Sequence, residues 1–524
     1  MADSKDIQVG HEHHSGGHTS TDPEFAGVAP RPSGWMYKKL GPLGWYASPA
    51  FQLTMVGFVC FLCPGMFNAL SGLGGGGQQD VTTANQATIA LYCFFCVVGF
   101  FAGSIVNRLG VRLTLGFGGI GYCVYVASFI CYNHTANRGF SVFAGAFLGF
   151  CAALLWAAQG AIMMSYPGEG NKGKYIAGFW IIFNLGAVLG SLIPLGQNIN
   201  NNTGTVTDGT YAAFVVLTFL GAILASTLVN ADKVIRKDGS KVILMKHPTW
   251  QSEILGLFEV LTTDWYIVLL FPMFFASNFF YTYHFQDVNA SKFDLRTRSL
   301  NGVLYWAMQM VGAGVFGLAL DSPFVSRRTR AKAALGALFV CTFGISYNPD
   351  LLQNTDNPPA IWGGGYAFQL TYDRTSNPNS GDAVKNVPPE NLLDWTSAGY
   401  GGPLVLYMFY GFFDAAWQTS VYWFMGCLSN NSRKLANFAG FYKSIQSAGG
   451  AIAPVIENSG APYMNALAAN WGLLAGSLLI AAPVIVMKVR DFVPVEEDLK
   501  FTDETLEDVV GVDTRYAEVK SEKI

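Results

Sequence analysis

Charged residues are scarce in this chain. They make up 13% of its 524 residues, whereas an average soluble protein is about one quarter charged. The formal net charge is −3, so the basic excess that is typical of nucleic-acid-binding proteins is missing. The composition therefore gives no support to a nucleic-acid partner and points away from an ordinary soluble protein.

Catalytic and cofactor-binding motifs with a supporting context are also missing. Gly72 to Gly77 formally fits the dinucleotide motif G-x-G-x-x-G, but it follows a long apolar run and not a strand of a soluble unit, so nucleotide binding is not favoured. The sequence has no P-loop, no zinc-protease motif and no evident nucleophile–base spacing, so neither ATP-driven transport nor an enzyme is favoured. Cys60 and Cys63, like Cys93 and Cys96, have C-x-x-C spacing, but both pairs lie within apolar runs without a second pair. We interpret them as packing thiols, and we expect neither a metal site nor a cofactor.

Long apolar runs dominate the chain, of which 51% is hydrophobic. Continuous runs of about twenty residues are long enough to cross a bilayer as helices, whereas β-barrel strands would be shorter and alternating. The sequence predicts an all-α membrane protein with twelve transmembrane helices in two six-helix halves. The predicted spans are about 50–71, 84–106, 111–132, 139–165, 174–196, 211–230, 265–286, 299–320, 331–347, 401–428, 435–457 and 463–488.

Lysine and arginine positions predict the orientation in the membrane. If the N-terminus is cytosolic, most of the 32 Lys and Arg residues fall on the cytosolic side, as the positive-inside rule requires. We expect a multi-pass protein of the plasma membrane or an endomembrane, with both termini cytosolic and the first span as its own targeting signal. The expected segments are a disordered tail (1–45), an N-terminal half (46–230), a cytosolic linker (231–264), a C-terminal half (265–490) and an acidic tail (491–524).

This topology places two long loops and three candidate glycosylation sites. The linker carries Trp250, Ile254, Leu257, Phe258 and Leu261 at helical spacing, which predicts a helix lying on the inner membrane surface. The outer loop 348–399 contains the apolar patch IWGGGYAFQLTY; a simple loop is favoured over a re-entrant or capping segment. Asn133, Asn201 and Asn289 begin glycosylation sequons on the predicted outer side.

The two halves contain an internal repeat. Gly103 and Asn107 lie at the end of the second span, and Gly317 and Asp321 lie at the end of the eighth at the same offset. A second similarity joins Gly178-Phe179-Trp180 to Gly440-Phe441-Tyr442 and aligns Asn184 with Gln446. Repeats of this kind build many secondary transporters, whose binding sites lie between the repeats near the midplane.

The first of these stretches resembles the G-x-x-x-D-R-x-G-x-R loop motif of the major facilitator superfamily, with Asn107 at the position of the acid. That resemblance implies a conformational latch at the cytosolic side, with the residues Gly103, Asn107, Arg108, Arg112, Gly317 and Asp321. Further stretches resemble fungal members of the Unc-93-like family within that superfamily, and His284 stands where a glutamine-like residue would be expected. These stretches are CPGMFNALSGLGGGGQ, SNFFYTYHFQDVN, RTRSLNGVLYW and GFYKSIQSAGGAIAP. The resemblance implies a twelve-helix facilitator fold and no particular substrate.

Asp414 and Lys443 are the central candidates for function. Asp414 lies near the middle of the tenth span, and Lys443 lies in the eleventh. Ionisable groups inside membranes usually face a bundle interior or a wet cavity, and they pair. We interpret them as a pair in a substrate or ion pathway; the alternative is a structural ion pair that only fixes the helices.

Other polar or aromatic residues within the spans are weaker candidates for the same pathway. They are Asn68, Asn184, Gln446, His284 and Trp417. Hydrogen bonding between helices, a satisfied interface histidine and aromatic packing are the respective alternatives.

These observations predict a facilitator-type transporter that moves an unidentified small solute by alternating access, with ion coupling left open. The alternative is a non-transporting membrane protein that regulates or chaperones a channel or receptor, because the Unc-93-like family includes a suspected channel subunit and a trafficking chaperone. The expected partners are the lipid bilayer, a small solute and, under the alternative, another membrane protein.

Overall fold

The computed structural model describes residues 33–72, 81–198, 208–243, 249–343, 361–374, 392–499 and 502. Helices build almost all of this part of the chain, beside one short hairpin of β1 (Lys39–Gly41) and β2 (Gly44–Trp45). A helix or a nearly continuous series of helical segments covers most of the described part of each of the twelve predicted spans. Nine of these, within the described residues, are long and apolar enough to cross a membrane.

The N-terminal six spans form the first half of the bundle. They are α1 (Pro49–Cys60), η3 (Phe61–Gly65) and α2 (Met66–Gly72) as one span, then α3 (Val81–Leu109), α4 (Val111–Thr135), α5 (Arg138–Ser165), α6 (Lys172–Asn198) and α7 (Asp208–Thr227).

The last six spans form the second half. They are η7 (Trp265–Leu270), α9 (Phe271–Thr282) and η8 (Tyr283–Ala290) as one span, then α10 (Leu295–Leu320), α11 (Arg327–Phe343), α13 (Gly401–Leu428), α14 (Ser432–Asn458) and α15 (Tyr463–Lys488). The helix α11 has 17 residues, and α13 and α14 carry charged and amide side chains within their spans, which lowers their hydropathy.

Shorter helices lie outside the spans. Helix α8 (Trp250–Thr263) forms where the linker helix was predicted, and the apolar side chains of Trp250, Ile254 and Phe258 remain exposed on it. Helix α12 (Ile361–Gln369) replaces the simple loop that the sequence favoured, and it packs against α11, α13 and α15. The remaining short helices are η2 (Trp35–Tyr37), η5 (Glu169–Asn171), η6 (Ala231–Lys233) and α16 (Val495–Leu499).

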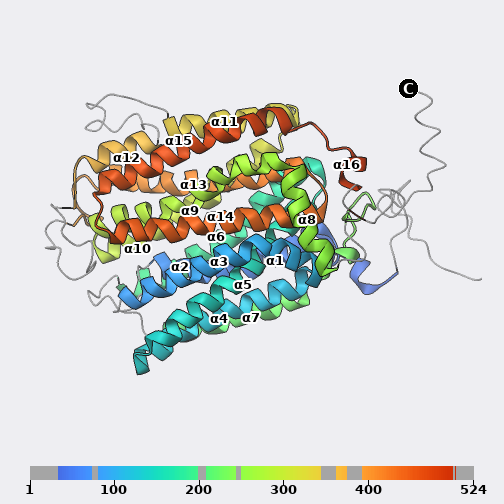
Figure 1. Ribbon diagram of the computed structural model, residues 1–524. Coiled ribbons are helices and arrows are strands. Elements are labelled where there is room, and N and C mark those ends of the chain that lie inside the picture. The colour runs from blue at the N-terminus through green and yellow to red at the C-terminus, as the bar shows by residue number, and fades with distance from the viewer. Residues whose placement is uncertain are drawn as a thin grey trace, which may run out of the picture.

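The two halves lie side by side along parallel helix axes (Figure 1). Helix α14 packs against α3 and α5, and α10 packs against α6, so these pairs form the interface between the halves. We call the end of the bundle that holds α8 and α16 the inner end and the end that holds α12 the outer end, after the predicted orientation; they lie at the right and left of Figure 1.

Glycine permits the closest approach between the halves. A β-carbon at Gly103 of α3 would lie 2.6 Å from the carbonyl oxygen of Ala436 in α14. The repeat places Gly317 of α10 equally close to Gly173 and Ala177 of α6. Small residues that let two backbones meet are typical of helix packing in membranes.

The first span of each half is interrupted by a wide helical turn. The π-helical segment η3 contains Pro64, which cannot donate a backbone hydrogen bond, and η8 follows α9 in the corresponding span of the other half. Such turns often mark functional positions in a helix. Interruptions at corresponding places in two repeats point to the region where a transporter site is built.

Candidate functional site

Asp414 is buried in the C-terminal half, where α10 and α13 face each other. Its side chain has no exposed surface. The Tyr305 hydroxyl donates to Oδ2 at 3.1 Å, the Gln309 amide donates to the same oxygen, and Gln418 Nε2 donates to Oδ1 at 2.7 Å. Hydrogen bonds to a charged group stabilise by about 1.5–3 kcal/mol each, so these donors offset part of the free energy of burying a carboxylate.

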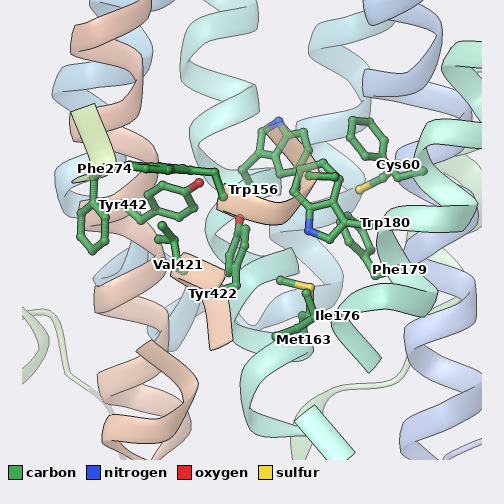
Figure 2. Close-up of a cluster of buried hydrophobic side chains, with 14 of the residues drawn as sticks. Cys60, Trp156, Met163, Ile176, Phe179, Trp180, Phe274, Val421, Tyr422 and Tyr442 are labelled. Atoms are coloured by element: carbon green, nitrogen blue, oxygen red, sulfur yellow. The ribbon is translucent and has the colours of Figure 1, made fainter. Parts of the chain in front are cut away.

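Lys443 of α14 lies at the interface between the halves and is 4% exposed. Its Nζ lies 4.2 Å from the ring centroid of Trp156, which belongs to α5 of the N-terminal half. The rings of Tyr442 and Tyr422 lie 5.0 Å and 5.5 Å away, and the three rings come together in Figure 2. A desolvated cation over aromatic faces is stabilised by about 2 kcal/mol.

Two glutamines connect the charges. Lys443 Nζ donates to Gln446 Oε1 at 2.7 Å, Gln446 Nε2 donates to Gln418 Oε1 at 3.0 Å, and Gln418 Nε2 donates to Asp414. We call these four residues the central polar chain. Every donor in it points from the lysine toward the aspartate, so the amide dipoles are aligned with both charges.

The predicted pairing of Asp414 with Lys443 is indirect in this conformation. Among the described residues, no salt bridge joins Asp414 to Lys443; the two charges interact through Gln418 and Gln446. The physical reason is their depth: the residues lie on adjacent helices at different heights, and two amide side chains fill the space between them.

His284 reaches the same chain through one tyrosine. Its Nδ1 lies 3.3 Å from the Tyr305 hydroxyl, which in turn donates to Asp414. The imidazole is fully buried and stacks on Tyr410, with ring centroids 4.1 Å apart. A residue predicted near the outer helix end is thus part of the interior network.

The other predicted pathway residues lie apart from the central polar chain. Asn184 Nδ2 donates to the Trp180 carbonyl within its own helix, and Trp417 Nε1 donates to the Met273 carbonyl, which ties α13 to α9. Asn68 is half-buried in α2 near the outer end. The structure shows packing and helix contacts for Asn184 and Trp417.

At the first predicted latch, the acidic side chain comes from Glu253 in the linker helix α8. Asn107 Nδ2 donates to Glu253 Oε2 of α8 at 2.9 Å, and Glu253 Oε1 lies 3.0 Å from Arg433 Nε at the start of α14. Glu253 is fully buried. Burial raises the pKa of Glu253, and Arg433 and Asn107 offset part of that rise. The Glu253 carboxylate thus supplies beside Asn107 the negative charge that the motif has at this position. It contacts both halves, because Asn107 belongs to α3 and Arg433 to α14.

The second predicted latch joins α10 to α6. Asp321 Oδ2 accepts a hydrogen bond from the backbone amide of Lys174 at 2.7 Å, in the first turn of α6. A carboxylate at a helix N-terminus is stabilised by the helix dipole. Burial raises the pKa of Asp321, while the backbone amides of Lys174 and Gly173 lower it.

The two predicted latch arginines do not bridge the halves. Arg108 is exposed, and Arg112 Nε donates to the Ser226 carbonyl within the N-terminal half. Lys172 bridges the halves instead, because its Nζ donates to the carbonyls of Gly426 and Ser429 at the end of α13. These contacts close the inner end of the interface.

Two hollows in the described part of the chain lie away from the central charges. One, of about 370 Å³, lies on the inner surface beside Arg328, Phe492 and Pro494. The other, of about 20 Å³, lies near the outer end beside Asp287 and Glu457. Each residue of the central polar chain is at most 4% exposed, so the chain is buried in this conformation.

A model of the Major Facilitator Superfamily matches residues 50–392 of the sequence. The chain belongs to the major facilitator superfamily. Within it, the chain is a UNC93-like membrane protein: it is 48% identical to a UNC93-like protein of Schizosaccharomyces pombe over 89% of this chain and 90% of that protein. It is 40% identical to UNC93-like protein 1 of Arabidopsis thaliana, over 93% and 96%.

Solved structures of the superfamily share the fold. The proton:xylose symporter XylE, bound to 6-bromo-6-deoxy-D-glucose, aligns with a TM-score of 0.59 at 11% identity, covering 84% of this chain and 97% of that one. The E. coli fucose:proton symporter FucP aligns with a TM-score of 0.52 at 12% identity, over 82% and 97%. At such identities the likeness concerns the fold, and the prediction of a twelve-helix facilitator fold is confirmed.

The glycosylation candidates of this facilitator differ in access. Asn133 is exposed at the end of α4 and donates to Asp208 at 2.8 Å. Asn289 is 3% exposed and is hydrogen-bonded to Asn301 and Arg298, so the folded chain has no room for a glycan there. Asn201 lies outside the described residues.

Sequence reasoning missed several residues that complete the facilitator's central site. Gln418 lies four residues after Asp414, hence on the same helix face, and Gln309 and Tyr305 lie four residues apart on α10. Amide side chains in the middle of a span were the available signal. Glu253 had no such signal, because an acid in a cytosolic linker is ordinary.

Proposed function

We propose that this protein is a secondary transporter that moves a small solute by alternating access between the halves 46–230 and 265–490. The observation that carries the proposal is the central polar chain. It retains two opposite charges in an apolar interior, and Lys443 packs on Trp156 across the interface. An arrangement that only stabilised the fold would do as well with apolar side chains.

In this proposal the conformation at hand is closed at the inner end. The contacts of Lys172, Asp321 and Glu253 hold the halves together there, and they would break when the inner end opens. The segment 231–264 links the halves, and both termini lie in the cytosol. Solute or an ion entering between the halves would replace Gln418 or Gln446 as a partner of the charges.

The test is uptake by proteoliposomes that contain the full-length protein, with and without a pH gradient. The solutes are a panel of labelled sugars, amino acids and inorganic cations. We expect Asp414→Asn and Lys443→Met to lower uptake at least about tenfold, since each removes charge-assisted hydrogen bonds of about 1.5–3 kcal/mol. Asp232→Asn and Lys38→Met change exposed groups and serve as matched controls. Full uptake by both central variants would refute the proposal.

A non-transporting role is the second candidate, and the enclosure of Asp414 and Lys443 is the observation that favours it. A regulator or chaperone would keep the facilitator fold without opening a path to these groups. Affinity purification of the full-length protein from its native membrane distinguishes the two. A stoichiometric membrane partner together with no uptake of any solute in the panel would establish this role.

A further inference from the structure

A second buried polar cluster lies near the outer end of the C-terminal half, away from the central polar chain. It surrounds the cavity of about 20 Å³, which holds about one water molecule. Asp287 of η8, Glu457 of α14 and Asn470 of α15 line the cavity. The wide turn of η8 places Asp287 toward the other two helices.

Hydrogen-bond acceptors outnumber donors in this cluster. Asp287 is 1% exposed, and neither of its carboxyl oxygens receives a hydrogen bond from a donor. Asn470 is 4% exposed, and its Oδ1 also has no donor. Leaving one such buried group unsatisfied costs about 1–3 kcal/mol, and more for a charged group. A ligand that supplies positive charge or a hydrogen-bond donor would therefore stabilise this cluster.

One arginine neutralises only one of the two acids. Arg374 Nη1 donates to Glu457 Oε1 at 3.0 Å and its Nη2 donates to Oε2. Asp287 lies against Glu457, within hydrogen-bonding range. Two carboxylates and one guanidinium leave an excess negative charge in a buried place. Glu457 also lies in the last turn of α14, where the helix dipole disfavours an anion.

We propose that Asp287 and Glu457 bind one proton between them, taken from the outer side. The proton sits on one carboxyl group, which then donates a hydrogen bond to the other, so the cluster with Arg374 becomes neutral. Water in the adjacent cavity, held by Asn470 Oδ1, delivers the proton. The bound proton holds η8 against α14, and its loss sets two carboxylates against each other.

A proton suits this site better than a metal ion. Both oxygens of Glu457 are already engaged by Arg374, whereas hard cations such as Ca²⁺ take about six to eight oxygen ligands. The other titratable and charged groups near Asp287 are Tyr283 on its own segment, Tyr372 and Arg374 after α12, Tyr463 of α15, and Lys292, whose Nζ lies 5.4 Å from the Tyr372 ring centroid. The proposal is independent of whether the protein transports.

The test is the thermal unfolding of the purified full-length protein across about pH 5 to pH 9. Asp287→Asn mimics the protonated state without an ionisable group. We expect the melting temperature of the wild type to fall by several degrees more than that of Asp287→Asn as the pH rises, and the variant to be the more stable protein at the alkaline end. Asp208→Asn, which changes an exposed carboxylate at the same end of the bundle, should follow the wild type.

Two outcomes would overturn the proposal. In one, the wild type and Asp287→Asn lose stability equally toward alkaline pH. In the other, sodium chloride but not choline chloride restores the wild type at alkaline pH, which would make the site a metal-cation site. Should Asp287→Asn fail to fold, infrared titration of the Asp414→Asn, Glu253→Gln, Asp321→Asn triple variant decides, because these substitutions remove the other buried carboxyl groups described above. A protonated carboxylic-acid band that persists near neutral pH supports the proposal, and its absence refutes it.

Discussion

Gln418 links Asp414 to the rest of the central polar chain. Its Nε2 donates to Asp414, and its Oε1 accepts from both Gln446 and Tyr442. A neutral amide can serve an anion and a donor at once. It therefore allows a lysine and an aspartate to remain buried at different depths without direct contact.

Replacing this glutamine by an apolar residue tests that interpretation. Gln418→Leu removes the donor to Asp414 Oδ1, whereas Gln446 Nε2 keeps the Ser277 hydroxyl as an acceptor. We expect a loss of about 1–3 kcal/mol for the carboxylate oxygen that is left unsatisfied. The measurement is thermal unfolding of the purified protein. Gln251→Leu, at an exposed position of α8, is the control. Equal stability of the two variants would contradict the role given to Gln418.

Asn107 stands where the superfamily motif has an acid, so replacing it by aspartate is a second test of single-residue contacts. Asn107→Asp restores the acid of the superfamily motif, yet here the new carboxylate would face that of Glu253, which Asn107 now contacts at 2.9 Å. Like charges in a partly buried site repel, so we expect the substitution to lower the melting temperature. Glu253→Gln in the same chain should rescue it, and a double-mutant cycle measures the coupling. Additive effects would contradict the contact.

Helix α8 connects the two halves and also packs against them. Glu253, Gly256, Leu257 and Val260 form its buried face, and the guanidinium of Arg433 rests against Gly256, where a side chain would overlap it. The opposite face presents apolar side chains outward. The helix is therefore placed to hold α3 and α14 together, and we expect its apolar face to lie on the membrane surface.

The raised pKa of Glu253 gives this contact a pH dependence. A carboxyl group whose pKa is higher in the folded than in the unfolded protein contributes most to stability below its ordinary value of about 4.3, and that contribution is lost as the pH rises through the folded pKa. Glu253→Gln removes the titration. We expect the wild type to lose stability relative to Glu253→Gln as the pH rises, measured by thermal unfolding of both proteins. A constant difference across the pH range would contradict this.

For the whole molecule, the surface agrees with a membrane environment. Large apolar side chains are exposed along the outside of the bundle, among them Phe94 and Val97 on α3 and Val216 and Phe219 on α7. Such extensive apolar surface is rare on soluble monomers. The ends of the bundle differ, because the contacts of Glu253, Asp321 and Lys172 lie at the inner end and the proposed proton site lies near the outer end.

Glycosylation tests which end faces outward. If the outer end is extracytosolic, Asn133 is the accessible acceptor and Asn289 is sealed within hydrogen bonds. We expect Asn133→Gln to abolish the shift in gel mobility that a glycosidase produces at this site, and Asn289→Gln to leave that shift unchanged. Modification at Asn289 in the folded protein would contradict the burial described here.

The central site was only partly predictable from its residues. Asp414 and Lys443 were identified because a charge in an apolar run is rare, and Gln446 because the repeat aligns it with Asn184. Gln418 and Gln309 were missed because an amide in a span has many uses. The partners of Asn107 were beyond sequence reasoning, since Glu253 and Arg433 are separated from it by 146 and 326 residues.

The helices and their order follow from the amino-acid sequence alone. Each span is set by a local property, the length of an apolar run, and the repeat of Gly103 and Gly317 marks where the halves approach. Which polar groups come into contact depends on the packing of the helices. A helix that is apolar nearly all round does not reveal its rotation, so packing alone placed two glutamines between Asp414 and Lys443 and set Asp287 against Glu457.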